Sequence, residues 1–140
     1  GSTSGITEAD NQLACARVND TTVSIATGVF SNQGFMLRVD SPIQLTTEIG
    51  QVGFFRRDLV VAEYTVGGGS TSDEHVLKII KGIQNSNEGS TTDPALEQDD
   101  LRAGVAGDVR QEPLYRIRIS GTTMSATIDR IAPLVGSYYA

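Results

Sequence analysis

A chain of 140 residues has the length of one ordinary domain, and 39% hydrophobic with 20% charged residues is the composition of a globular one. The net charge of −6, with only 11 Lys and Arg, excludes nucleic acid as an expected partner, since phosphate binding needs clustered cations. No apolar run approaches the ~18 residues needed for membrane insertion, and one Cys with one His excludes both an internal disulfide and a nitrogen-and-sulfur zinc site.

The first half of the chain predicts short strands separated by turns. Residues 1–5 (GSTSG) lack the basic and apolar parts of a signal peptide, so we assign them to a flexible leader or an expression remnant. Alternation of polar and apolar residues with period two is typical of half-buried strands. In chain order the pattern predicts one or two helical turns over 10–17, a hairpin of strands 22–30 and 35–39, and a strand over 43–49.

The middle of the chain predicts a second, larger hairpin. Residues 59–62 (LVVA) are apolar at successive positions, as in a central strand that is covered on both faces. The run 58–66 (DLVVAEYTV) matches the run 75–82 (HVLKIIKG) in length and residue type. We therefore expect the two runs to pair, with the loop between them as a flexible hairpin tip that tolerates insertions.

The remaining segments complete an all-β fold. Asp93 and Pro94 have the residue types of a helix N-cap and first helical position, which predicts a short helix ending near Gly104. Two closing strands are expected over 114–119 and 124–131. About seven strands with one or two short helices favour an antiparallel β-sandwich or open barrel. The boundaries that follow are 6–136 for this single β domain and 137–140 for a C-terminal tail.

The residue types of catalytic sites are nearly absent. His75 is the only histidine, and its position beside Asp73 and Glu74 favours a solvated loop-edge side chain over a general base. Cys15 has no cationic neighbour beyond Arg17, which favours a buried or half-buried structural thiol over a nucleophile. We therefore predict no catalytic residue and no enzyme. A hydrolase would need two carboxylates, or His75 with a nucleophile, in one pocket.

The acidic and glycine-rich segments give no ligand motif. Glu97, Asp99 and Asp100 lack the spacing of a calcium loop, so a solvated helix face is favoured over a metal site or a glycosidase carboxylate pair. Residues 67–69 (GGG) are followed neither by Lys-Ser/Thr nor by a helix, which argues against a phosphate-binding loop. The sequence thus predicts neither a metal nor a cofactor.

Two groups of arginines supply the candidate structural and assembly residues. Arg57 and Asp58, next to Arg56, open a predicted strand, where an arginine–aspartate pair would hold the start of the strand in place. A surface anion site is the alternative for this group. Arg116 and Arg118 lie two residues apart and so share one face of their strand, opposite the apolar residues. This cationic stripe is suited to pairing with acidic residues of a neighbouring strand or subunit.

Five short motifs occur in an order that resembles a known family. They are ITEAD at 6–10, RDLVV at 57–61, VLKIIKG at 76–82, DP at 93–94 and PLYRI at 113–117. In this order they resemble the small N-terminal or attachment domains of baseplate and tail-fibre proteins of tailed phages and prophages, over residues 6–134. Members of that group are structural virion components without a cofactor, and they commonly assemble as trimers in fibres or as rings in baseplates.

The resemblance implies a non-catalytic structural component of a phage tail, baseplate or tail fibre that mediates subunit assembly and supports host recognition. The implied partners are further copies of the chain, with a trimer expected first, and other tail or baseplate proteins. The implied location is the virion, assembled in the bacterial cytoplasm. The alternative function is a carbohydrate-binding module that recognises a host-surface glycan. With no Trp in the chain, its aromatic contacts would fall to Tyr138 and Tyr139.

Overall fold

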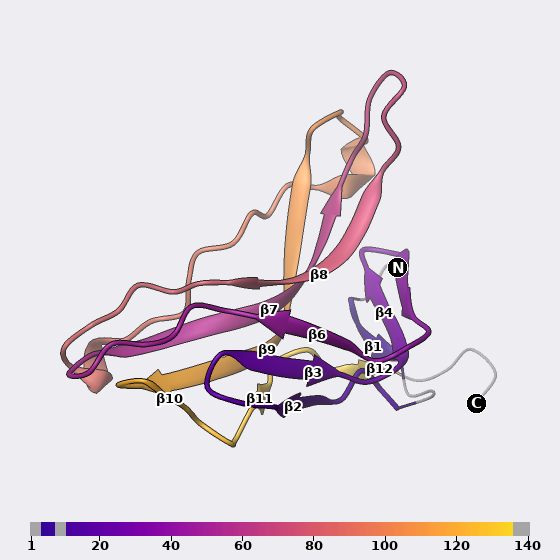
Figure 1. The fold of residues 1–140 in the computed structure, drawn as a ribbon. Coiled ribbons are helices and arrows are strands. Elements are labelled where there is room, and N and C mark those ends of the chain that lie inside the picture. Colours follow the sequence, from indigo (N-terminus) through magenta and orange to yellow (C-terminus); the bar gives the residue numbers. More distant parts are fainter. Residues whose placement is uncertain (1–3, 8–10, 136–140) are drawn as a thin grey trace.

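The computed structural model describes residues 4–7 and 11–135, and these form an all-β fold. This part of the chain contains twelve strands and two single 3-10 turns, η1 (Glu88–Ser90) and η2 (Leu101–Ala103). The sheets curl into a half-barrel at the base of the molecule, and three long strands rise from it (Figure 1). The predicted fold class, an antiparallel β-sandwich or open barrel, is confirmed.

The strands of the described part form three sheets. The largest has the order β10 (Thr123–Met124), β9 (Val109–Ser120), β7 (Phe55–Thr65) and β8 (Glu74–Ile80), and β11 (Asp129–Arg130) also pairs with β9. The second has the order β12 (Leu134–Val135), β1 (Gly5–Thr7), β4 (Gly28–Asn32) and β5 (Phe35–Val39). The third has the order β2 (Cys15–Arg17), β3 (Thr22–Ile25) and β6 (Ile43–Thr46). Of the ladders described, the β1–β12 ladder is parallel and the others are antiparallel.

Strand β7 lies at the centre of the fold, as its apolar run predicts. Residues 59–62 are at most 3% exposed, so the strand is covered on both faces. The side chains packed around it come from all three sheets and include Ile6, Ile25, Phe30, Leu114, Ile117 and Met124. One core therefore joins the three sheets into a single packed unit.

A β-bulge in β9 marks the place where the central strands bend. Val60 pairs with Tyr115 and Val61 with Pro113, which leaves Leu114 as an extra residue in β9. Pro113 has no N–H to give to a ladder, and a bulge tolerates that loss. The Leu114 carbonyl accepts hydrogen bonds from two amides of the segment before β12, at 2.8 and 3.2 Å. The bulge thus bends the sheet and also attaches the C-terminal part of the described chain.

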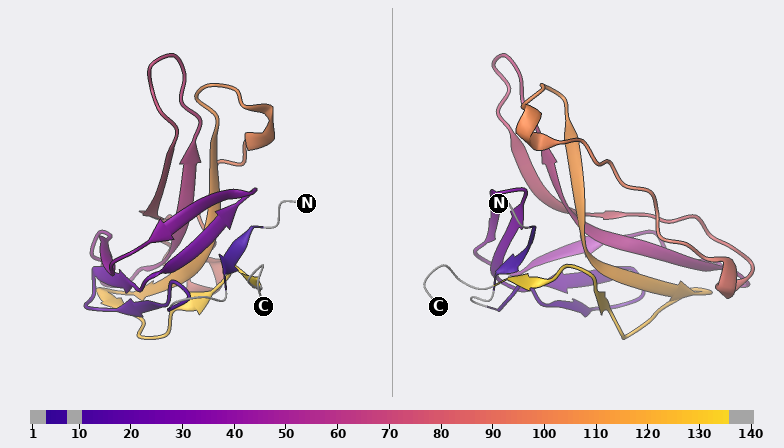
Figure 2. Two further views of the ribbon diagram at one scale, coloured as in Figure 1. Left: turned by 90° about the vertical axis from the view of Figure 1, so that its right-hand side faces the viewer. Right: turned by 180° about the vertical axis from the view of Figure 1, so that it is seen from behind.

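Beyond the bulge, β7, β8 and β9 leave the base and form an arm, which we define as residues 62–77 and 99–112 (Figure 2). The predicted hairpin of β7 and β8 is present, paired from Leu59–Ile80 to Thr65–Glu74. Its tip is not an unstructured loop, because the Thr71 amide donates to the Gly68 carbonyl at 2.9 Å.

The helical turns predicted over residues 10–17 are wrong for the described residues 11–17. Gln12 and Leu13 have positive φ values of 55° and 51°, which a right-handed helix excludes. Leu13 is fully buried, and its amide donates to the Thr27 carbonyl at 3.1 Å. Burial of this one apolar side chain holds the chain in a turn, after which β2 begins at Cys15.

The helix predicted from Asp93 to Gly104 is reduced to the single turn η2. Its N-cap is Asp100, whose Oδ1 accepts from the Arg102 amide at 3.0 Å, and Gly104 ends it with a φ of 65°. Asp93 does not cap a helix, because both of its carboxylate oxygens bind Arg116. Asp93 is therefore used in an ion pair with a residue distant in sequence, and not as the cap of a local helix.

Three boundaries also differ from the sequence-based prediction. The leader was expected to include residues 4 and 5, but the Ser4 hydroxyl accepts from the Gln33 amide at 3.1 Å and Gly5 begins β1. The strand expected over 22–30 is divided into β3 and β4, which lie in different sheets. The strand expected over 124–131 is divided into β10 and β11.

Candidate functional site

Arg56 and Asp58 form a buried ion pair at the start of β7. They lie two residues apart and therefore on the same face of the strand. Arg56 Nε is 2.8 Å from Asp58 Oδ1, Arg56 Nη2 is 3.1 Å from Asp58 Oδ2, and the two side chains are 3% and 0% exposed. The sequence predicted Arg57 as the partner of Asp58. That was wrong, because adjacent strand residues point to opposite faces.

The Asp58 carboxylate also connects β7 to the segments on either side. Its Oδ2 accepts from the Thr47 hydroxyl at 2.6 Å, and its Oδ1 accepts from the Gly82 amide at 2.9 Å. Arg56 donates in addition to the Glu48 carbonyl at 2.5 Å. A Cβ at Gly82 would lie 1.9 Å from the Arg57 carbonyl oxygen, so only glycine fits there. These contacts are internal, and they make the pair a structural clasp.

The opposite face of β7 and β9 carries the predicted cationic stripe. Arg116 binds Asp93 through two hydrogen bonds of 2.7 and 2.6 Å, and Arg118 Nε lies 3.1 Å from Asp129 Oδ2. Hydrogen bonds from Arg116 hold the pKa of Asp93 below its usual value, and Asp93 in turn raises the pKa of Arg116. The acidic partners thus come from the same chain rather than from another subunit.

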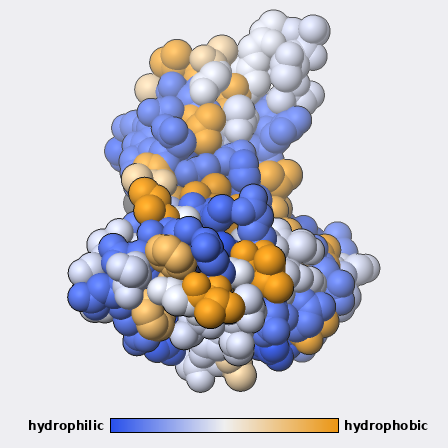
Figure 3. Space-filling model, turned by 60° about the vertical axis from the view of Figure 1, so that its left-hand side comes forward, coloured by the Kyte–Doolittle hydropathy of each residue, from blue (hydrophilic) through white to orange (hydrophobic). Residues whose placement is uncertain are grey.

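Three exposed aliphatic side chains lie in loops at one end of the base. Ile83, Val52 and Ile49 are 84%, 79% and 60% exposed, the highest values among the large hydrophobic side chains of the described residues. Their loops are adjacent, because Gln84 Nε2 donates to Gln51 Oε1 at 3.0 Å. The end of the base that carries these loops comes forward in Figure 3, where apolar and polar side chains are interspersed. We call Ile49, Val52 and Ile83 the apolar tip.

Sequence reasoning missed the apolar tip. Each of its residues stands alone in a polar or glycine-rich segment, so period-two patterns do not mark them. No local signal could have found them, because single aliphatic residues exposed in loops are common on protein surfaces.

His75 lies in the arm and is half-buried, not a solvated loop-edge residue. Its ring packs edge-on against Tyr64 with centroids 5.1 Å apart, and its Nδ1 lies 3.2 Å from the Met36 carbonyl. Its Nε2 is buried without a hydrogen-bond partner among the described residues. Burial lowers the His75 pKa, so the neutral ring is favoured at physiological pH.

Tyr64 connects the aromatic packing of the arm to its tip. Its hydroxyl donates to Asp73 Oδ2 at 2.5 Å, and Asp73 Oδ1 accepts from the Gly67 amide at 2.7 Å. Burial, with the hydrogen bond to Asp73, raises the pKa of Tyr64 to about 12, while the same hydrogen bond lowers the pKa of Asp73. The tyrosine therefore keeps its proton and serves as a structural donor.

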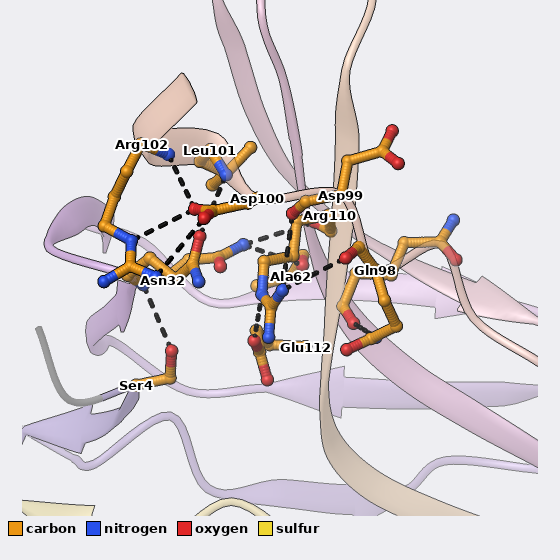
Figure 4. A network of polar contacts seen from close by, with 12 residues as sticks. Ser4, Asn32, Ala62, Gln98, Asp99, Asp100, Leu101, Arg102, Arg110 and Glu112 are labelled. Carbon is orange, nitrogen blue, oxygen red and sulfur yellow. Dashed lines mark hydrogen bonds and ion pairs between the residues drawn. The ribbon is translucent and has the colours of Figure 1, made fainter. Parts of the chain in front are cut away.

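The acidic cluster predicted as a helix face instead organises turns of the arm. Asp100 caps η2, and Asp99 Oδ2 accepts from the Val109 amide at 2.9 Å. Figure 4 shows Asp99 and Asp100 beside Arg110 and Asn32, where the β4–β5 hairpin meets the arm. Asn32 Nδ2 donates to the carbonyls of residues 62 and 110 at 3.4 and 3.3 Å. Across residues 4–7 and 11–135, no group of three His, Cys, Asp or Glu side chains is arranged to hold a metal ion.

Cys15 and the two C-terminal tyrosines are the other residues that the sequence analysis singled out. Cys15 is half-buried in β2, and burial raises the pKa of its thiol to about 12, so little thiolate exists at neutral pH. The candidate glycan contacts Tyr138 and Tyr139 lie outside the described residues. No helix in the described part of the chain has the length and apolar character that a membrane crossing requires.

The comparisons with known proteins identify no relative. No family model, no curated protein and no solved structure matches the chain.

Proposed function

We propose that the chain is a non-catalytic structural domain of a phage tail, baseplate or tail fibre. In this role it assembles with copies of itself, as a trimer, and with other tail proteins in the virion, and it supports host recognition. The ordered motifs from residue 6 to residue 117 support the family. Internal contacts of Asp58 and Asp100, which hold a strand start and a 3-10 turn, agree with a structural role for these carboxylates.

The apolar tip is the observation that carries the proposal. Large contiguous apolar patches are rare on monomeric proteins and mark interaction sites, and aliphatic side chains in adjacent loops could together supply such a patch. Ile83, Val52 and Ile49 are each at least 60% exposed, so contact with a partner would remove most of their apolar surface from water. The energetic gain from such burial favours assembly over a free monomer.

The arm offers a second surface for assembly. Within the described residues β8 pairs with β7 alone, so its other edge presents unpaired backbone groups. An open edge strand is a natural template for pairing with another chain. Lys78 Nζ on β8 lies 3.1 Å from Glu63 Oε2 on β7. A lysine on an edge strand limits non-specific pairing of that edge with other chains.

Multi-angle light scattering on the purified chain tests the proposal. We expect a mass three times that of one chain at high micromolar concentration, with dissociation on dilution. A strictly monomeric species across that range would contradict self-assembly through these surfaces.

A further inference from the structure

A cavity of about 270 Å³ opens on the outer face of the β7–β9 ladder. Phe55 pairs with Ser120 and Arg57 with Arg118, so these four lining residues alternate on one face of the two strands. Residues 88 and 91, in and after η1, and residues 123 and 125 of the β10 segment supply the other walls. The cavity is therefore framed by sheet on one side and by two crossing segments on the others.

One cation beside this cavity is only weakly paired within the protein. Arg57 and Arg118 are like charges directly opposite each other, an arrangement that destabilises a strand pair. Arg118 has Asp129 as partner, but Arg57 Nη1 lies 4.0 Å from Asp93, whose two oxygens are already bound to Arg116. Among the described residues, the Arg57 guanidinium makes no hydrogen bond. Its fork of donors is thus free to bind a planar anion such as a carboxylate.

The other residues that line the cavity indicate which class of anion it would bind. Glu88 is an exposed carboxylate that accepts hydrogen bonds and repels a multiply charged ligand such as phosphate. Ser120, Thr123 and Ser125 add hydroxyl groups that both donate and accept. Phe55 adds an apolar ring, the kind of surface on which the C–H face of a sugar packs. A ligand with one carboxylate, several hydroxyl groups and a compact ring satisfies all of these.

We propose that this cavity binds a carboxylated sugar unit, a uronic acid, with its carboxylate on Arg57 and Arg118 and its hydroxyl groups toward Glu88 and the serine and threonine side chains. The site is distinct from the apolar tip, whose residues do not line the cavity. A tail domain that assembles through the tip would keep this cavity for an acidic polysaccharide of a cell surface. The inference stands on the cavity alone and does not require self-assembly.

Titration of the whole chain with D-glucuronate and D-galacturonate, followed by amide NMR shifts, tests the site. We expect saturable shifts at millimolar ligand for at least one uronate, centred on residues 55–57 and 118–125. D-Glucose and inorganic phosphate serve as the neutral sugar and the non-sugar anion, and both should bind more weakly by about tenfold or more. Equal binding of glucose or phosphate, or no saturable shift with either uronate, would overturn the proposal.

Substitutions test whether uronate binds specifically in this cavity or is attracted by any exposed arginine. Arg57→Gln and Arg118→Gln should each weaken uronate binding by about tenfold, because each removes charge-assisted hydrogen bonds. Arg102→Gln removes the same charge from η2 in the arm, at a side chain 71% exposed, and should leave affinity unchanged. If one cavity variant fails to fold, the other still decides the outcome. Equal weakening by all three substitutions would contradict a specific site.

Discussion

At the scale of single residues, the stability of the fold depends on a pair that the sequence marks only in part. The cluster Arg56–Asp58 was predicted to pin the start of a strand, and it does so. Strand periodicity places Arg56, and not Arg57, on the face of Asp58, whereas the burial of that face could not be predicted from the residues of β7. The third partner, the Gly82 amide, comes from 24 residues away and leaves no local signal.

Asp58→Asn should destabilise the protein by about 3 kcal/mol, because it leaves the buried Arg56 guanidinium without a counter-charge. Urea unfolding followed by far-ultraviolet circular dichroism measures the loss. Asp40→Asn is the matched control, since Asp40 is 80% exposed and lies 3.9 Å from Arg38. That substitution should change the unfolding free energy by about 0.5 kcal/mol or less. Equal effects of the two substitutions would mean that the clasp contributes nothing specific.

At the scale of elements, runs of apolar and β-branched residues predicted the β7–β8 hairpin and the β9 strand, but not the bend between arm and base. The bulge at Leu114 depends on register across two strands, which a single segment cannot reveal. The helix predicted at Asp93 failed for a related reason. A capping pattern is local, whereas the ion pair to Arg116 joins residues 23 positions apart.

His75 should make the stability of the arm depend on pH. Burial lowers its pKa in the folded state, so the unfolded chain binds a proton more readily as pH falls below about 6.5. Stability from the neutral ring is therefore present above this pH and is lost as pH falls through the folded-state pKa. The thermal midpoint of the wild type should fall more between pH 7.5 and pH 5.5 than that of His75→Phe.

Asp73 does not confuse this test, because hydrogen bonds lower its pKa and keep it ionised across the same interval. Parallel pH profiles for the wild type and His75→Phe would show that the histidine ring is not buried in its neutral form.

The loop at the tip of the arm offers a separate test of the hairpin. Gly69 has a φ of 59° and open space around its Cα, so it lies at a point where the chain makes few contacts. A short Gly-Ser insertion after Gly69 should leave the thermal midpoint within a few degrees of the wild type. Replacing Asp73 with Ala should lower the midpoint more, because it removes acceptors for the Tyr64 hydroxyl and the Gly67 amide. The opposite order would contradict the assignment of Asp73 as the anchor of the tip.

At the scale of the whole molecule, composition and periodicity predicted the class of fold, while the surfaces on which the proposals rest were found only in the structure. The predicted stripe at Arg116 and Arg118 is largely neutralised within the chain. The apolar tip had no sequence pattern, because the loops at 49–54 and 82–85 that carry its residues become neighbours only in the fold. No family model, curated protein or solved structure matches the chain, so the proposed family rests on the order of the motifs alone.

Assembly through the apolar tip is tested most directly by the mass in solution of the double variant Val52→Ser, Ile83→Ser. Val105→Ser is the matched control, since Val105 is 56% exposed and lies beside η2 in the arm. We predict that the wild type and Val105→Ser form the same oligomer at high micromolar concentration, whereas the double variant is monomeric and equally well folded. An oligomer of unchanged mass in the double variant would contradict assembly through the tip.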